Sequence, residues 1–190
     1  MIDTRVRPHL QGILVPIGRF LAGLGVTPAA MTSIGLVVTI VGAVLIGLGD
    51  LAVGGVIALI GSALDGLDGT VARAAGTVTD RGAFLDSASD RIGEIASFAG
   101  LAVAMQGNGR ALLLIVLSVG GAMLVPYLRA RAESVGVDGR NGLMGRAERV
   151  ILFALGLVTG VVEPMLWAMV VSVWLTAVYR FITSYRAIET

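Results

Sequence analysis

Long apolar runs, separated by short polar or glycine-containing segments, make up most of the chain after residue 26. An α-helix needs about 20 predominantly apolar residues to cross the hydrocarbon core of a bilayer. The pattern therefore predicts an all-α integral membrane protein with six transmembrane helices. The expected spans are residues 31–49, 51–73, 81–106, 110–134, 146–160 and onward, and 164–186.

The beginning of the chain has a different pattern. Arg5, Arg7 and Arg19 alternate with apolar positions over residues 1–25, a distribution typical of a helix that lies along the membrane surface. We expect an N-terminal juxtamembrane amphipathic helix there. The six-helix transmembrane domain then occupies residues 26–190.

Composition agrees with a membrane protein and narrows the chemistry. Of the 190 residues 56% are hydrophobic and only 14% are charged, and the mean hydropathy is +0.90. Soluble domains carry about 25% charged residues. The chain has no cysteine, which excludes disulfide and thiolate chemistry, and its net charge of +1 argues against nucleic acid as a partner. All 14 basic residues are arginine, which suits bidentate binding of phosphate.

Four carboxylates interrupt the apolar pattern. Asp65, Asp68, Asp86 and Asp90 lie within or beside the second and third expected spans. A carboxylate at the bilayer centre costs about 2.5–3.5 kcal/mol on insertion scales, and neighbouring carboxylates also disfavour one another's ionisation. A positive partner is therefore required. Hard divalent cations such as Mg²⁺ prefer oxygen ligands, so a metal site is the first interpretation and an intramembrane ion-transport site is the alternative.

The spacing of the four carboxylates favours one site. Intervals of three and four residues place Asp65 with Asp68, and Asp86 with Asp90, on one face of a helix. Gly69 and Gly82 leave room for a second backbone or a ligand phosphate to approach. Two helices that each offer a carboxylate pair can hold one or two cations.

These residues also form a known pattern. It reads Asp65-x-x-Asp68-Gly69-x-x-Ala72-Arg73, eight further residues, then Gly82-x-x-x-Asp86-x-x-x-Asp90. The pattern resembles the signature of the CDP-alcohol phosphotransferases at every fixed position, and the hydrophobic layout around it extends the resemblance to nearly the whole chain.

The resemblance implies specific roles. It implies that Asp65, Asp68 and Asp86 bind metal, and that Asp90 is the catalytic base and shares in a second metal ion. It implies Mg²⁺, with Mn²⁺ as the alternative, two ions in number, and a homodimer. The nucleotide part of a CDP-lipid would be held by Gly69, Arg73, Thr79, Ala29, Ala30, Met31 and Thr32. Many relatives have Asn or Asp where this chain has Ala29.

Arginines in the second half of the chain suggest a site for an anionic acceptor. The alternative is that they are anchors at lipid headgroups. Within the family, this region resembles the phosphatidylinositol-phosphate synthases of actinobacteria and their archaeal ether-lipid counterparts, with arginine at 129 where lysine is frequent and Pro126 where serine often stands. The candidate acceptor-phosphate ligands are Arg129, Arg131, Arg146, Arg149 and Arg180.

Arginine placement also predicts the orientation. All but two of the 14 arginines fall at one face of the six-span arrangement; Arg110 falls at the other face and Arg91 within the third span. By the positive-inside rule, both termini and the aspartate site face the cytoplasm, and we expect a multi-pass protein of the plasma membrane.

The expected reaction is transfer of the phosphatidyl group of CDP-diacylglycerol to inositol 1-phosphate (1D-myo-inositol 3-phosphate), which yields phosphatidylinositol phosphate and CMP. The alternatives are the same chemistry with glycerol 3-phosphate as acceptor or an archaeal-type ether lipid as donor, an aspartate-rich prenyltransferase, and a non-catalytic ion carrier.

Overall fold

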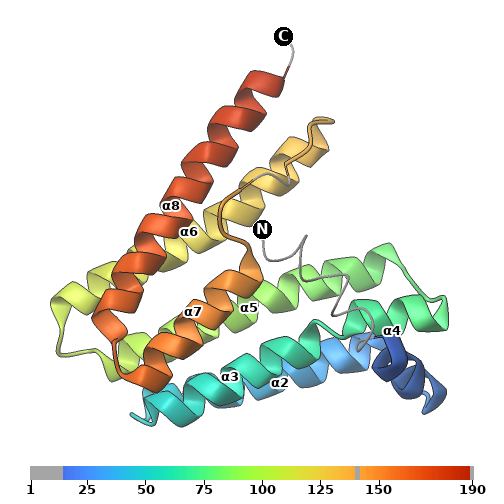
Figure 1. The fold of residues 1–190 in the computed structure, drawn as a ribbon, viewed down its shortest axis with the longest axis horizontal. Helices are drawn as coiled ribbons and strands as arrows, with labels where there is room; N and C mark the ends of the chain where they lie inside the picture. Colours follow the sequence, from blue (N-terminus) through green and yellow to red (C-terminus); the bar gives the residue numbers. More distant parts are fainter. Residues whose placement is uncertain (1–14, 140–141, 189–190) are drawn as a thin grey trace. The chain divides into compact units, whose positions relative to one another are not determined.

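The structure, a computed structural model, describes residues 15–139 and 142–188 (Figure 1). The expected all-α fold is confirmed, since no strand occurs within those residues. Residues 15–23 are helical, whereas Arg5, Arg7 and Arg140 lie outside the described residues. The helices that follow are α2 (Pro28–Gly47), α3 (Leu51–Asp65), α4 (Asp68–Ala75), α5 (Asp80–Ala104), α6 (Gly109–Ser134), α7 (Arg146–Thr159) and α8 (Val162–Ala187).

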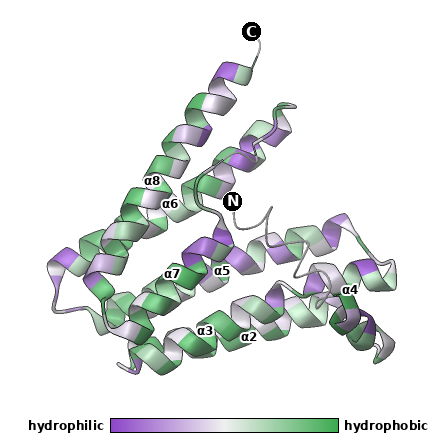
Figure 2. Cartoon of the chain, viewed as in Figure 1, coloured by the Kyte–Doolittle hydropathy of each residue, from purple (hydrophilic) through white to green (hydrophobic). Residues whose placement is uncertain are grey.

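Helix length and composition support a membrane protein. In the described part of the chain, four segments are long and apolar enough to cross a bilayer: Pro28–Gly47, Leu51–Ala75, Gly109–Ser134 and Val162–Ala187. Apolar residues cover most of these helices, as the hydropathy colouring shows (Figure 2). Helix α5 has the length but carries several charges, and α7 has only 14 residues.

The second expected span, residues 51–73, is broken rather than continuous. Helix α3 ends at Asp65 and α4 begins at Asp68. The N–H of Leu67 donates to the carbonyl of Leu64 at 3.1 Å, which is the tighter spacing of a 3₁₀ turn. Glycine at 66, which has a low helix propensity, lies in this turn.

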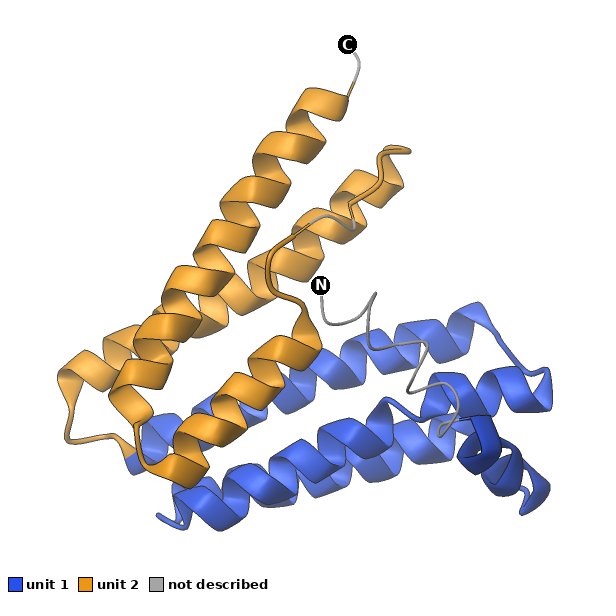
Figure 3. Ribbon diagram, in the orientation of Figure 1, with its two compact units in different colours: residues 1–104 blue, residues 105–190 orange. Residues whose placement is uncertain are grey.

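The helices fall into two compact units, residues 1–104 and 105–190 (Figure 3). In the first unit α2 is central, and it contacts α3, α4 and α5. In the second unit α8 is central, and it contacts α6 and α7. The aspartates belong to the first unit and the acceptor arginines to the second.

Glycines allow α2 and α3 to pack with their backbones close together. A Cβ added at Gly42 would lie 2.5 Å from the amide nitrogen of Ala58, and one at Gly54 would lie 2.7 Å from that of Ile46. Close approach at small residues is a common way for membrane helices to associate, because lipid is as apolar as the helix surface. The α2–α3 pair is therefore fixed by backbone proximity.

Polar contacts support the packing of the second unit. The indole Nε1 of Trp174 on α8 donates to the carbonyl of Leu117 on α6 at 3.0 Å. The amide of Met144, in the loop before α7, donates to the hydroxyl of Thr176 on α8 at 3.1 Å. This loop thus lies along α8 beside Gly142, where a Cβ would meet the Thr176 side chain at 2.9 Å.

Replacing Gly42 with alanine should destabilise the protein, because the new methyl group meets backbone that cannot move alone. Overpacking costs about 1–3 kcal/mol, which lowers the melting temperature by roughly 2–12 °C for a chain of this size. The matched control is Gly47→Ala on the same helix, where the nearest atom to the new Cβ is 3.6 Å away. Thermal unfolding in detergent measures both variants, and equal melting temperatures would contradict the proposed α2–α3 packing.

Candidate active site

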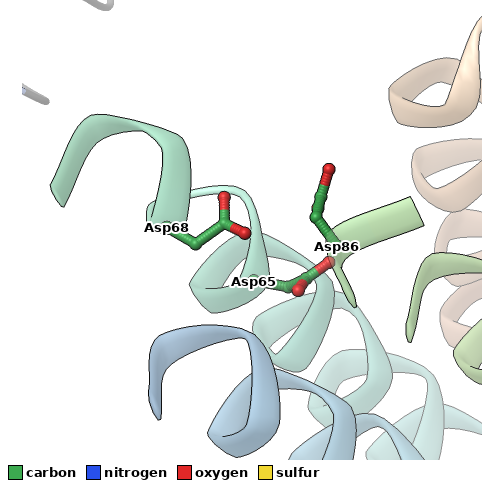
Figure 4. Close-up of side chains that lie close together, drawn as sticks. All are labelled: Asp65, Asp68 and Asp86. Carbon is green, nitrogen blue, oxygen red and sulfur yellow. The ribbon is translucent and has the colours of Figure 1, made fainter. Parts of the chain in front are cut away.

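Three of the four predicted aspartates gather at the break between α3 and α4. Asp65 ends α3, Asp68 begins α4 and Asp86 lies on α5. Each offers one carboxylate oxygen, and these oxygens all lie within 4.8 Å of one another (Figure 4). Asp65 is buried, and the other two are half-buried. Residues from three helices therefore form one acidic cluster.

The break in the helix corrects the geometric argument from spacing. Asp65 and Asp68 were expected on one face of a continuous helix, but they flank the turn at Gly66 and Leu67. Asp65 is the last residue of α3 and Asp68 the first of α4, so each carboxylate is carried by its own helix. The two side chains still reach the same cluster.

Close packing of α2 on α3 accounts for the burial of Asp65. A Cβ at Gly35 of α2 would lie 2.7 Å from the amide nitrogen of Asp65 and 2.7 Å from the carbonyl oxygen of Gly61. Only a residue without a side chain fits at position 35. The α2 backbone therefore covers the end of α3, and Asp65 retains only 3% of its exposure.

Thr32 joins α2 to the acidic cluster. It lies in the first turn of α2, and its hydroxyl donates to the Asp68 carboxylate at 2.8 Å. Thr32 was predicted as one of four residues that line the nucleotide pocket. In the same turn Met31 is buried, Ala30 is half-buried and Ala29 is exposed. Among these four residues, Thr32 is the one whose hydrogen bond to the acidic cluster the structure describes.

Asp90 has a different environment from the other three aspartates. It follows Asp86 by one turn of α5, and its carboxylate pairs with Arg91 at 3.2 Å. Arg91 also pairs with Glu94 at 3.6 Å, and the Glu94 side chain is 7% exposed. The base candidate therefore lies in a small charge network on α5. Arg91 was not expected to contact it, although the sequence places Arg91 next to Asp90 and three residues before Glu94.

The predicted nucleotide ligands Gly69, Arg73 and Thr79 lie on and just after α4. Arg73 is exposed, and its Nη2 donates to the hydroxyl of Thr70 at 3.3 Å. The hydroxyl oxygen of Thr79 accepts a hydrogen bond from the amide of Gly82 at 3.1 Å, which caps the beginning of α5. Its hydroxyl proton remains able to donate to a phosphate. Thr70 was not predicted, because a threonine inside a helix has no signal of its own.

The predicted acceptor arginines lie in the second unit. Arg149 and Arg180 are buried, and Arg180 donates to the carbonyl of Val125 at 2.6 Å. The charges of Arg129, Arg149 and Glu133 act on Arg180, so these groups share one region. Arg129 pairs with Glu133 at 2.9 Å.

The remaining two acceptor candidates are more accessible. Arg131 is exposed and donates to the hydroxyl of Ser134 at 3.1 Å, and Arg146 is half-buried at the beginning of α7. Arg149 and Arg180 are the stronger candidates for an anion site, because they are buried cations that share one region with Arg129.

The acidic cluster fits a divalent metal ion. Its donor set is entirely carboxylate oxygen, which hard cations prefer, and its ligand atoms already lie within one coordination sphere of each other. A bound cation would also offset the repulsion between the three carboxylates. The site can therefore hold a metal that neutralises phosphate charge.

Comparison with known proteins shows a family relationship that extends over nearly the whole chain. The sequence profile described as CDP-alcohol phosphatidyltransferase matches residues 25–179. An archaetidylinositol phosphate synthase of Pyrococcus horikoshii is 30% identical over 98% of this chain and 98% of its own length. A phosphatidylinositol phosphate synthase of Mycobacterium marinum is 35% identical over 92% of this chain and 77% of its own length.

The fold also matches a solved structure. The crystal structure of Mycobacterium tuberculosis phosphatidylinositol phosphate synthase with CDP-DAG bound has a TM-score of 0.85, 29% identity, and coverage of 94% of this chain and 98% of that chain. The same enzyme has been crystallised with manganese and citrate. With its complete motif, its acidic cluster and a profile match over residues 25–179, the chain belongs to the CDP-alcohol phosphatidyltransferase family, whose members are transferases.

Proposed function

We propose that the protein transfers the phosphatidyl group of CDP-diacylglycerol to a hydroxyl of 1D-myo-inositol 3-phosphate and releases CMP. The observation that carries the proposal is the cluster of Asp65, Asp68 and Asp86, placed within a helical membrane protein. The two relatives described above are an archaetidylinositol phosphate synthase and a phosphatidylinositol phosphate synthase. Both names denote a lipid with an inositol phosphate headgroup, which supports inositol phosphate as the acceptor for this chain.

The donor would bind with its diphosphate at the acidic cluster. Mg²⁺ or Mn²⁺, two ions in the full site, would supply charge neutralisation of the diphosphate when bound. Asp65, Asp68 and Asp86 would hold the metal, and Thr32 would keep Asp68 directed at it. Gly69, Arg73, Thr79 and the first turn of α2 would bind the cytidine diphosphate group.

Asp90 would act as the base. It lies one helical turn beyond Asp86, so its carboxylate can face a hydroxyl placed beside the donor phosphorus. It would take the proton of the attacking hydroxyl while the oxygen bonds to the lipid-side phosphorus and CMP departs. Arg91, paired with both Asp90 and Glu94, would hold the Asp90 carboxylate in place.

The acceptor phosphate would bind at the arginine cluster. Arg149 and Arg180 are buried cations, and Arg129 lies in the same region. A phosphate dianion would neutralise part of their charge and accept several charge-assisted hydrogen bonds. Uncharged inositol would gain no such charge-assisted hydrogen bonds, so the cluster favours a phosphorylated acceptor. Arg131 and Arg146, which are more accessible, would also contact the acceptor phosphate.

Arginine positions support six crossings. Arginines lie near the C-terminal ends of α4, α6 and α8. The opposite end of α6 carries Arg110, which pairs with Glu163 at the beginning of α8 at 3.2 Å. If the arginine-rich ends face the cytoplasm, α5 must cross between α4 and α6, and α7 must cross between α6 and α8. Both ends of the domain and the aspartates would then face the cytoplasm, as expected for a plasma-membrane enzyme that meets a soluble acceptor.

Two further parts of the arrangement remain proposals. Residues 1–25 would form the juxtamembrane amphipathic helix, of which residues 15–23 are helical, and residues 26–190 would form the six-helix domain. A homodimer is also proposed, because the chain has 27 glycines, which suit close packing between membrane helices.

Replacing Asp90 with asparagine should reduce turnover by about 10²-fold or more, because the amide cannot take the proton of the acceptor hydroxyl. The affinity for cytidine diphosphate should change little, since the three clustered carboxylates stay intact. CMP release in detergent with Mg²⁺ measures the first quantity and calorimetric titration the second. Turnover close to that of the wild type would contradict the assignment of the base.

Purified protein supplied with CDP-diacylglycerol should release CMP with inositol phosphate, and much more slowly with inositol or glycerol 3-phosphate.

Arg149→Ala should raise KM for inositol phosphate about tenfold or more and leave KM for the donor unchanged, because a charged hydrogen bond to phosphate is lost. Arg110→Ala is the matched control: it also removes an arginine of α6–α8, about 28 Å along α6 from Arg129. Activity with glycerol 3-phosphate alone would contradict the proposed acceptor.

A further inference from the structure

We propose that Thr70 is a positioning residue for the CDP-lipid site, because it fixes the guanidinium of Arg73 and is itself held by the juxtamembrane helix at Gly18. The proposal rests on the proposed function, in which Arg73 binds the cytidine diphosphate group. It assigns the juxtamembrane helix a part in donor binding in addition to lying on the membrane surface.

Thr70 lies at the centre of this arrangement. It is buried, with 5% of its surface exposed, and its hydroxyl accepts a hydrogen bond from Nη2 of Arg73 at 3.3 Å. The two residues are three apart on α4, so they share one face of the helix. The hydroxyl therefore gives the exposed arginine a fixed point on a buried side chain.

The neighbouring glycine shows where the guanidinium lies. A Cβ at Gly69 would be 3.3 Å from Nη1 of Arg73, so the guanidinium folds back over the backbone of Gly69. That backbone lies beside Asp68, whose carboxylate belongs to the acidic cluster. The two contacts thus hold the Arg73 guanidinium over Gly69, which is next to Asp68 in the chain, before a ligand binds.

Fixing this side chain has an energetic benefit. A free arginine loses rotamer entropy when it becomes ordered. A hydrogen bond that orders it before the ligand arrives removes part of that cost from binding. The effect should appear in donor affinity more than in the chemical step.

Helix residues 15–23 hold Thr70 from the other side. Gly18 is buried, and a Cβ there would lie 2.7 Å from the Thr70 Cγ2 and 3.0 Å from its carbonyl oxygen. The juxtamembrane helix therefore contacts α4 at the residue that holds Arg73. The next glycine of this helix, Gly23, has no atom within 4 Å of an added Cβ.

The first experiment measures the affinity for cytidine diphosphate in detergent with Mg²⁺. Thr70→Val keeps the shape but removes the hydroxyl, and it should raise Kd about threefold to tenfold, the size of one hydrogen bond. Thr70→Ser keeps the hydroxyl and should restore affinity. In an Arg73→Ala background Thr70→Val should have no further effect, which a purely structural role would not produce.

The second experiment tests the contact at Gly18. Gly18→Ala should weaken cytidine diphosphate binding by a similar factor, because the new methyl group displaces Thr70. Gly18→Ala combined with Thr70→Ser should recover part of that loss, since the displaced Cγ2 is gone. Gly23→Ala is the control and should bind as the wild type does.

The outcomes separate the two proposals. If Arg73→Ala weakens binding while Thr70→Val does not, or if their effects are additive, the role of Thr70 is wrong and the proposed function stands. If Gly18→Ala binds as the wild type does, the part of the juxtamembrane helix is wrong. If the wild type does not bind cytidine diphosphate, or Arg73→Ala binds it normally, the assigned donor site fails and this inference fails with it.

Discussion

The central constraint on the structure is a group of carboxylates that repel one another in apolar surroundings. Asp65, Asp68 and Asp86 converge from three helices, and Asp65 is almost fully buried. Such an arrangement is unfavourable on its own account, because each charge loses hydration and each repels its neighbours. It becomes favourable when a divalent cation and an anionic ligand complete the charge balance. The same property that makes the cluster costly therefore suits it to a divalent cation.

The rest of the first unit serves to hold that cluster in place. Glycine at 35 lets the α2 backbone cover Asp65, and Thr32, one turn earlier on α2, holds Asp68. A single helix thus controls two of the three ligands. Close packing at Gly35 fixes the backbone that carries Asp65, because a densely packed interior leaves little room for movement. In the second unit the grouped charges are positive, since Arg149 and Arg180 are buried in the same region as Arg129.

The sequence was sufficient for some of these features and insufficient for others. The aspartates were predictable because a carboxylate in an apolar run is costly without function, and the complete motif identified the family that the profile confirms. The break between α3 and α4 was not predictable from spacing, since a three-residue interval fits a continuous helix equally well. The hydrogen bond of Thr32 with Asp68 escaped prediction because it joins two helices, and that of Thr70 with Arg73, within α4, depends on the rotamer of Arg73. The contact of Arg91 with both Asp90 and Glu94 depends on rotamers, which sequence patterns do not encode.

The most direct test of the account is manganese binding by the protein in lipid nanodiscs, followed by electron paramagnetic resonance. The wild type should bind Mn²⁺, and cytidine diphosphate should tighten that binding, because metal and diphosphate complete one another's charge. Asp86→Asn should lose the signal of bound metal, whereas Asp50→Asn, which alters an exposed carboxylate before α3, should retain it. Equal manganese binding by the wild type and Asp86→Asn would contradict the claim that the aspartate cluster is a metal site.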